Sequence, residues 1–149
     1  TQLINDWRRF PAALVYRVAP VFAWFRWKPT QFTITIDGVA RTIRGHSVMV
    51  ANSGRYGHGL NMVPSASVDD GLLDVLTIGD APKLKMVTLM EEAKTGKHIR
   101  RAEIELSTGQ EVEISSASAQ SFSADGDVIG ELPVTVRLRP RALRVLCPT

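Results

Sequence analysis

The amino-acid sequence predicts a mainly β, α+β domain: an antiparallel β-sandwich with helices at its N-terminus and one inserted helix. Two observations lead to this fold class. The period of the apolar residues changes from three or four to two at Gln31. Beyond residue 103, short alternating runs follow one another, separated by turn residues. Because a half-buried sheet must cover its apolar face with another layer, so many short strands imply a sandwich.

Length and composition favour a single domain over residues 1–149. Of these 149 residues 44% are hydrophobic, enough to form one ordinary core. Cys147 is the only cysteine, so no intrachain disulfide can form, and a reducing, cytoplasmic compartment is the simplest expectation. Lys and Arg outnumber Asp and Glu by 18 to 15, which gives only a weak attraction to anionic surfaces.

The first part of the chain, about residues 2–28, has helical periodicity. Apolar residues recur there at spacings of three and four: Leu3, Ile4, Trp7, Phe10, Leu14, Val15, Val18, Phe22 and Phe25. Pro11 and Pro20 divide this face, which predicts two helical pieces. The longest apolar stretch, Ala12–Phe25, contains Arg17 and is shorter than the roughly 20 residues that span a bilayer. We therefore predict no transmembrane helix here.

The same segment mixes large aromatic side chains with cations, a composition favoured where a protein meets lipid headgroups. These residues are Trp7, Arg8, Arg9, Phe10, Trp24, Phe25, Arg26, Trp27 and Lys28. Each exposed cation near an anionic bilayer contributes on the order of 1 kcal/mol to binding. The segment thus favours transient membrane contact, with ordinary helix packing as the alternative.

Strands and one helix follow. Alternation from Gln31, ended by the Asp37-Gly38 pair, predicts a β-hairpin. The apolar runs Ser47–Ala51 and Leu72–Ile78, the second rich in branched residues, predict short buried strands. Pro82 opens a helix that should end near Gly96. Its predicted apolar face comprises Leu84, Val87, Leu89, Met90 and Ala93. The later predicted strands are Glu103–Leu106, Glu111–Ile114, Ser121–Ala124, Val134–Leu138 and Leu143–Cys147.

A glycine-bearing loop leaves the strand that ends at Ala51. It contains Asn52, Gly57, His58 and Gly59, and its glycines allow the backbone to approach a ligand closely. A plain turn is the alternative, because glycines after a strand mostly form turns. These four residues, together with Asp127 further along the chain, are candidates for lining a substrate cleft.

Two further motifs place carboxylates beside a glycine. Asp69 and Asp70 precede Gly71 and a strand. Magnesium binds oxygen ligands and needs few protein carboxylates. Asp70, with loop carbonyls and waters, could therefore hold a magnesium ion. Asp125 and Asp127 flank a glycine at the tip of a predicted hairpin. A carboxylate there could accept a proton from a substrate hydroxyl during phosphoryl transfer. In both motifs an ordinary Asp-Gly turn is the alternative.

Several other site classes do not fit the sequence. Gly54, Gly57 and Gly59 have the wrong spacing for a P-loop or a dinucleotide fingerprint, so a complete nucleotide site is not expected in this chain. The three histidines and Cys147 lack the spacing of zinc ligands.

The ordered set of motifs resembles the diacylglycerol kinase catalytic family, which includes bacterial lipid kinases, sphingosine kinases and ceramide kinases. The matching motifs are Val50-Ala51-Asn52, Gly57-His58-Gly59, Pro64-Ser65-Ala66, Asp69-Asp70-Gly71-Leu72-Leu73-Asp74, Gly96-Lys97-His98 and Asp125-Gly126-Asp127. Their joint order is more specific than any one of them. The resemblance covers nearly all of the chain and is closest to the soluble bacterial members.

The resemblance implies a two-domain enzyme of which this chain is the C-terminal domain, the N-terminal ATP-binding domain being absent from it. It implies that Asp125 is the general base for the lipid hydroxyl. Asp127 stands where the family has a glutamate, so a role carried over to it is in doubt. The resemblance also implies a structural magnesium ion held by Asp70 and by the backbone carbonyls of Ser67 and Leu72.

The expected activity is ATP-dependent phosphorylation of a lipid hydroxyl, with ATP and Mg²⁺ as cofactors. The expected substrate is diacylglycerol, which would become phosphatidic acid. This chain alone should be inactive. We expect a cytoplasmic protein, peripheral at the inner face of the membrane, whose partners are a membrane lipid, ATP and an anionic membrane surface, with no nucleic acid. A homodimer through an exposed sheet edge stays open. The alternatives are a nicotinamide-dinucleotide-kinase-like enzyme and a noncatalytic lipid-binding or partner-binding sandwich.

Overall fold

The computed structural model describes residues 28–56 and 59–143. The predicted N-terminal helices and the aromatic, cationic segment lie outside the described residues except for Lys28, as does the predicted last strand beyond Leu143. The described elements are β1 (Thr30–Ile36), β2 (Val39–Ala51), β3 (Arg55–Tyr56), β4 (Leu60–Asn61), β5 (Leu73–Gly79), α3 (Lys83–Ala93), the 3₁₀ helix η1 (Lys97–Arg100), β6 (Ile104–Gly109), β7 (Glu111–Ser116), β8 (Ser121–Ala124), β9 (Asp127–Glu131) and β10 (Val134–Arg137).

The main sheet has six strands in the order β10-β7-β1-β2-β5-β6, and all neighbours are antiparallel. The 13-residue strand β2 pairs with β1 up to Gly45 and with β5 from there to Ala51. The register shifts between Gly45 and Ser47, and such a bulge bends a strand. One long strand therefore belongs to both halves of the sheet. The antiparallel pairing throughout confirms the predicted mainly β, sandwich-like fold.

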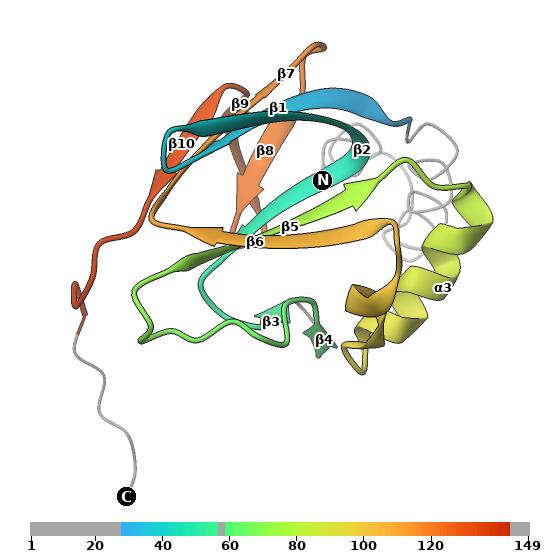
Figure 1. The fold of residues 1–149 in the computed structure, drawn as a ribbon, viewed down its shortest axis with the longest axis horizontal. Helices are drawn as coiled ribbons and strands as arrows, with labels where there is room; N and C mark the ends of the chain where they lie inside the picture. The colour runs from blue at the N-terminus through green and yellow to red at the C-terminus, as the bar shows by residue number, and fades with distance from the viewer. Residues whose placement is uncertain (1–27, 57–58, 144–149) are drawn as a thin grey trace, which may run out of the picture.

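Two apolar clusters lie on opposite faces of β5, whose side chains alternate between them. Val75 belongs to a cluster with residues of β1 and β7, such as Ile34 and Val112. Leu76 belongs to the other, which includes residues of α3 and the loop around Val63. Figure 1 shows α3, β3 and β4 on one side of β5, with β7, β10 and the β8–β9 hairpin on the other. Residues 73–78 are all buried, as the apolar run predicts.

The predicted hairpin at Asp37-Gly38 is confirmed. Both residues have positive φ, 48° and 83°, as a tight turn between twisted strands requires. The Asp37 carboxylate also accepts hydrogen bonds from the backbone N–H groups of Gln110 and Glu111, each 2.9 Å from Oδ1. The turn between β1 and β2 is thereby joined to the turn between β6 and β7.

The predicted helix forms as α3, but its predicted face is partly wrong. It ends at Ala93, three residues before Gly96. Its buried residues are Met86, Leu89 and Ala93. Leu84 is 79% exposed, and Val87 and Met90 are each 44% exposed. The helix carries apolar residues on both faces, so periodicity alone does not identify the face that packs on the sheet.

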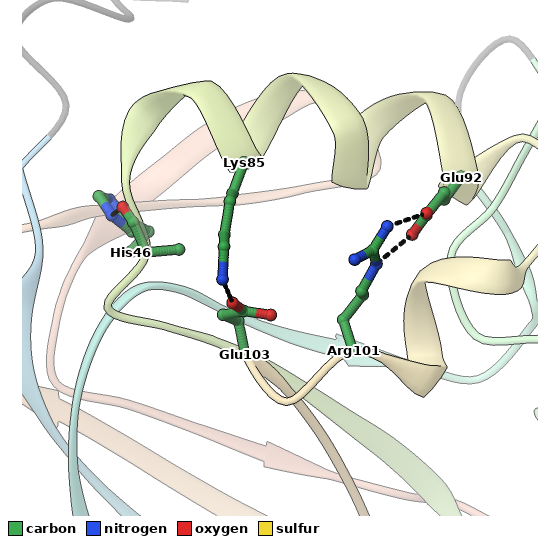
Figure 2. A network of polar contacts seen from close by, with 6 residues as sticks. His46, Lys85, Glu92, Arg101 and Glu103 are labelled. Atoms are coloured by element: carbon green, nitrogen blue, oxygen red, sulfur yellow. Dashed lines mark hydrogen bonds and ion pairs between the residues drawn. The ribbon is translucent and has the colours of Figure 1, made fainter.

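Polar contacts fasten α3 to the segment that leads into β6 (Figure 2). Arg101 donates to Glu92 through Nε, 2.9 Å from Oε2, and through Nη2, 2.5 Å from Oε1. Lys85 Nζ lies 2.5 Å from Oε1 of Glu103. On the same side, Nε2 of the buried His46 lies 3.1 Å from the Ala81 carbonyl oxygen, just before the helix.

Replacing Glu92 by Gln is expected to lower stability slightly at neutral pH and to have no effect in acid. Hydrogen bonding from Arg101 holds the pKa of Glu92 below its ordinary value of 4.5. A carboxylate with a lowered folded-state pKa stabilises the fold above its unfolded pKa, and the effect is lost as pH falls through the folded value. Urea unfolding of both proteins between pH 3 and pH 7 would measure this. A constant difference in unfolding free energy across that range would contradict the expectation.

Candidate functional site

Two of the predicted motifs leave the sheet side by side. Ala51, the last residue of β2, pairs with Asp74 near the start of β5. The loop that begins at Asn52 and the loop that contains Asp70 therefore meet at one end of this strand pair. Asn52 and Asp70 are both exposed. The structure thus brings together two motifs that are about 20 residues apart in the sequence.

The glycine-bearing loop is held by its own backbone. Val63 N–H donates to the Gly54 carbonyl oxygen over 3.2 Å. A Cβ atom at Gly54 would lie 2.6 Å from the Val63 carbonyl oxygen, so this close approach requires glycine. Gly59 is exposed and has a φ of 90°. Gly57 and His58, the other cleft candidates of this loop, lie outside the described residues.

A buried histidine contacts the backbone just after this loop, at the residue that follows β4. His98 is 1% exposed, and its Nε2 lies 2.9 Å from the Met62 carbonyl oxygen. A carbonyl oxygen only accepts, so Nε2 carries the proton. Its Nδ1 has no hydrogen-bond partner. The sequence shows this residue only as part of the Gly96-Lys97-His98 motif, and nothing in the sequence reveals its contact with residue 62.

The Asp-Asp-Gly motif forms a local hydrogen-bonded loop. Ser67 Oγ donates to Asp69 Oδ1 over 2.6 Å, and Leu72 N–H donates to Asp70 Oδ1 over 2.9 Å. The second bond is an Asx turn, in which a side chain replaces a backbone acceptor. Gly71 has a φ of 77°. The exposed Asp70 thus shares a short loop with the two residues whose carbonyls are the other predicted cation ligands.

Asp74 is a buried carboxylate that the sequence analysis did not single out. It is 3% exposed, and its Oδ2 has no hydrogen-bond partner. Burial, foremost, and the negative charge of Asp70 raise the pKa of Asp74, whereas a hydrogen bond from the Ser65 side chain lowers it. A signal was available in the sequence, because Asp74 interrupts the apolar run Leu72–Ile78.

These residues fit a hard cation such as magnesium. The donors are oxygens, two carboxylates lie within electrostatic reach of each other, and one buried carboxylate oxygen lacks a partner. Within the described part of the chain, no group of three or more His, Cys, Asp or Glu side chains is arranged to hold a metal ion. The fit therefore depends on backbone carbonyls beside the carboxylates, as predicted for Ser67 and Leu72.

Asp125 and Asp127 lie together in a different place. Strands β8 and β9 form a separate two-stranded sheet, and the turn between them has positive φ at Asp125 (51°) and Gly126 (98°). The predicted hairpin tip is confirmed. Both carboxylates are exposed, and so are the apolar side chains of Val128 and Ile129, at 42% and 62%. The hairpin therefore carries both exposed carboxylates and exposed apolar residues.

A shallow cavity of about 470 Å³ does not coincide with the predicted residues. It lies where the β1–β2 and β6–β7 turns meet, and it is lined by Asp37, Gly38, Gln110, Glu111, Arg137 and Leu138. Glu111 begins β7 and Arg137 ends β10, so the cavity lies at the ends of these two strands, and none of its lining residues is a predicted site residue.

Comparison with known proteins identifies the family. A family model described as "YegS C-terminal NAD kinase beta sandwich-like domain" matches residues 1–147. The chain belongs to this family. A diacylglycerol kinase of Mycobacterium tuberculosis (strain H37Rv) is 28% identical over 151 residues, which cover 98% of this chain and 48% of that protein. A diacylglycerol kinase of Staphylococcus haemolyticus is 26% identical over 87 residues, covering 58% of this chain and 26% of that protein.

A solved structure has the same fold. The crystal structure of a diacylglycerol kinase from Bacillus anthracis matches with a TM-score of 0.60 at 17% identity, covering 82% of this chain and 42% of that one. This likeness shows the fold alone. The chain spans about half the length of the Mycobacterium tuberculosis relative.

Proposed function

We propose that this chain is the C-terminal domain of an ATP-dependent lipid kinase, and that its substrate is diacylglycerol, which becomes phosphatidic acid. The observation that carries the proposal is the β8–β9 hairpin, which bears the exposed Asp125 in its turn and the exposed apolar residues Val128 and Ile129 in its second strand. A lipid alcohol needs both features: a proton acceptor for its hydroxyl and apolar surface for its chains. Relatives named diacylglycerol kinase support the substrate class.

In the proposed reaction Asp125 acts as general base. The lipid hydroxyl oxygen forms a bond to the γ-phosphorus of ATP, the bond from that phosphorus to the bridging oxygen breaks, and ADP leaves. The hydroxyl proton passes to the Asp125 carboxylate. The ATP would be held by an additional N-terminal domain, in keeping with relatives that are about twice as long as this chain. This chain alone is then inactive.

The other candidate residues have supporting roles in the proposal. Asn52, Gly57, His58 and Gly59 line the substrate cleft, where the glycines let the backbone approach the substrate closely. We also assign Asp127 to the substrate cleft; it is exposed and lies opposite Ala124 in the hairpin register.

Magnesium would have a structural role in this domain. We propose that Asp70 and the carbonyls of Ser67 and Leu72 hold the ion, which would neutralise the carboxylates and fix the loop. Oxygen donors of this kind suit a hard divalent cation. A rigid loop here would in turn fix the position at which the chain leaves β2 for Asn52.

The protein would act as a peripheral enzyme at the inner face of the membrane. No helix within the described residues is long and apolar enough to cross a bilayer. The proposal therefore assigns membrane contact to the aromatic, cationic segment up to Lys28. In this arrangement the substrate stays in the bilayer while ATP comes from the cytoplasm.

The experiment is ATP-dependent phosphate transfer to a panel of lipids in mixed micelles, using the full-length protein that contains this chain. We expect transfer to diacylglycerol and none to a soluble dinucleotide. Transfer to NAD instead would favour the nicotinamide-dinucleotide-kinase alternative. Absence of transfer to every acceptor would favour a noncatalytic sandwich.

A further inference from the structure

Asp74 is enclosed by three neighbouring elements. It belongs to β5, which lies between β2 and β6. In the strand register Asp74 pairs with Ala51 of β2 and with Thr108 of β6. Its side chain lies on the same face of β5 as Leu76, and the Ser65 hydroxyl hydrogen-bonds to it. Only 3% of the residue is exposed.

The surroundings leave this carboxylate incompletely satisfied. Its Oδ2 is buried and has no hydrogen-bond partner. Within the described residues, neither Asp74 nor Asp70 forms an ion pair with Lys, Arg or His. A buried carboxylate is strongly disfavoured unless it is paired or coordinates a metal. Asp70, four residues earlier in the loop that leads into β5, carries a second carboxylate.

We propose that Asp74 is a second carboxylate of the divalent-cation site, contributing its free Oδ2 to the ion directly or through a coordinated water. This inference rests on the cation proposed above at Asp70. It accounts for a buried acceptor that no protein group satisfies, because magnesium and its waters supply the missing positive charge and donors. Mg²⁺ usually retains several waters and uses one or two carboxylates, which matches this pair.

The test is Mg²⁺ binding by this chain, followed by thermal unfolding in increasing MgCl₂ and after treatment with EDTA. A site filled to about twenty times its dissociation constant should raise the unfolding temperature of the wild type by about 5 °C. Asp74→Asn keeps the shape of the side chain and its ability to bond Ser65 but removes the charge. We expect it to weaken Mg²⁺ binding by about tenfold or more. Asp70→Asn should have at least as large an effect.

Glu113→Gln is the matched control. Glu113 is an exposed carboxylate on β7, a strand that does not pair with β5, so this variant should keep wild-type Mg²⁺ affinity. Wild-type affinity in Asp74→Asn would overturn the inference. Absence of Mg²⁺ binding by the wild type would overturn it too, while the lipid assay would still report independently on the kinase proposal.

A measurement on the wild type covers the case in which Asp74→Asn does not fold. In ¹H–¹⁵N spectra of the chain, titration with MgCl₂ should shift the amide signals of Asp70, Asp74 and Ser65. Signals of Asp74 and Ser65 that stay fixed while that of Asp70 moves would overturn the inference.

Discussion

Replacing Asp125 by Asn in the full-length protein is expected to lower the turnover of lipid phosphorylation by about 10²- to 10⁴-fold, the usual contribution of a general base. The amide cannot accept the hydroxyl proton, which is the role proposed for the carboxylate. Asn is the appropriate substitution because Asp125 has a φ of 51°, and Asn tolerates this left-handed conformation. The turn should therefore persist, and steady-state turnover with diacylglycerol measures the chemical effect.

Glu131→Gln is the matched control for Asp125→Asn. It removes a carboxylate at the other end of the same hairpin, where Glu131 is exposed and pairs with Ser121. Its turnover should equal that of the wild type. Thermal unfolding of Asp125→Asn should also match the wild type. Near-normal turnover in a folded Asp125→Asn protein would reject Asp125 as the base.

Truncating Leu76 to Ala is expected to destabilise the chain by about 2–5 kcal/mol, the range found for buried Leu-to-Ala changes. Leu76 has no exposed surface and packs in the cluster that joins β5 to α3. The substitution removes apolar contacts and leaves a cavity that a strand held on both edges cannot collapse around. Urea unfolding monitored by circular dichroism measures the loss.

Leu84→Ala is the control for this substitution. It makes the same chemical change, but Leu84 is 79% exposed on the outer side of α3. Ala is at least as good a helix former as Leu, so the free energy of unfolding should stay nearly unchanged. Equal losses from the two substitutions would mean that the described core does not carry the stability of the chain.

The elements that local chemistry specifies could be predicted from the sequence. The Asp37-Gly38 and Asp125-Gly126 turns are predicted by residues that tolerate positive φ. The burial of β5 on both faces is predicted by its apolar run. Periodicity does not predict β9, since Val128 and Ile129 are adjacent rather than alternating. It also does not predict the bulge in β2, because that depends on pairing with two different strands.

The candidate site was partly predictable for a related reason. The motif residues Asn52, Asp70 and Asp125 stand out because each accompanies a glycine at a strand end or turn. The sequence does not show that the Asn52 and Asp70 loops meet, because this depends on the register that sets Ala51 opposite Asp74. The buried state of Asp74 and the contact of His98 with the Met62 carbonyl are long-range effects of packing.

The β8–β9 hairpin lies outside the main sheet, so substitutions within it should disturb the core little. None of residues 121–131 is buried, whereas β5 is buried over residues 73–78. Mutations that accumulate in the hairpin meet little constraint from the core. Under the proposed function, residues that would meet the lipid can thus be replaced at little cost to the stability of the scaffold that carries the cation loop.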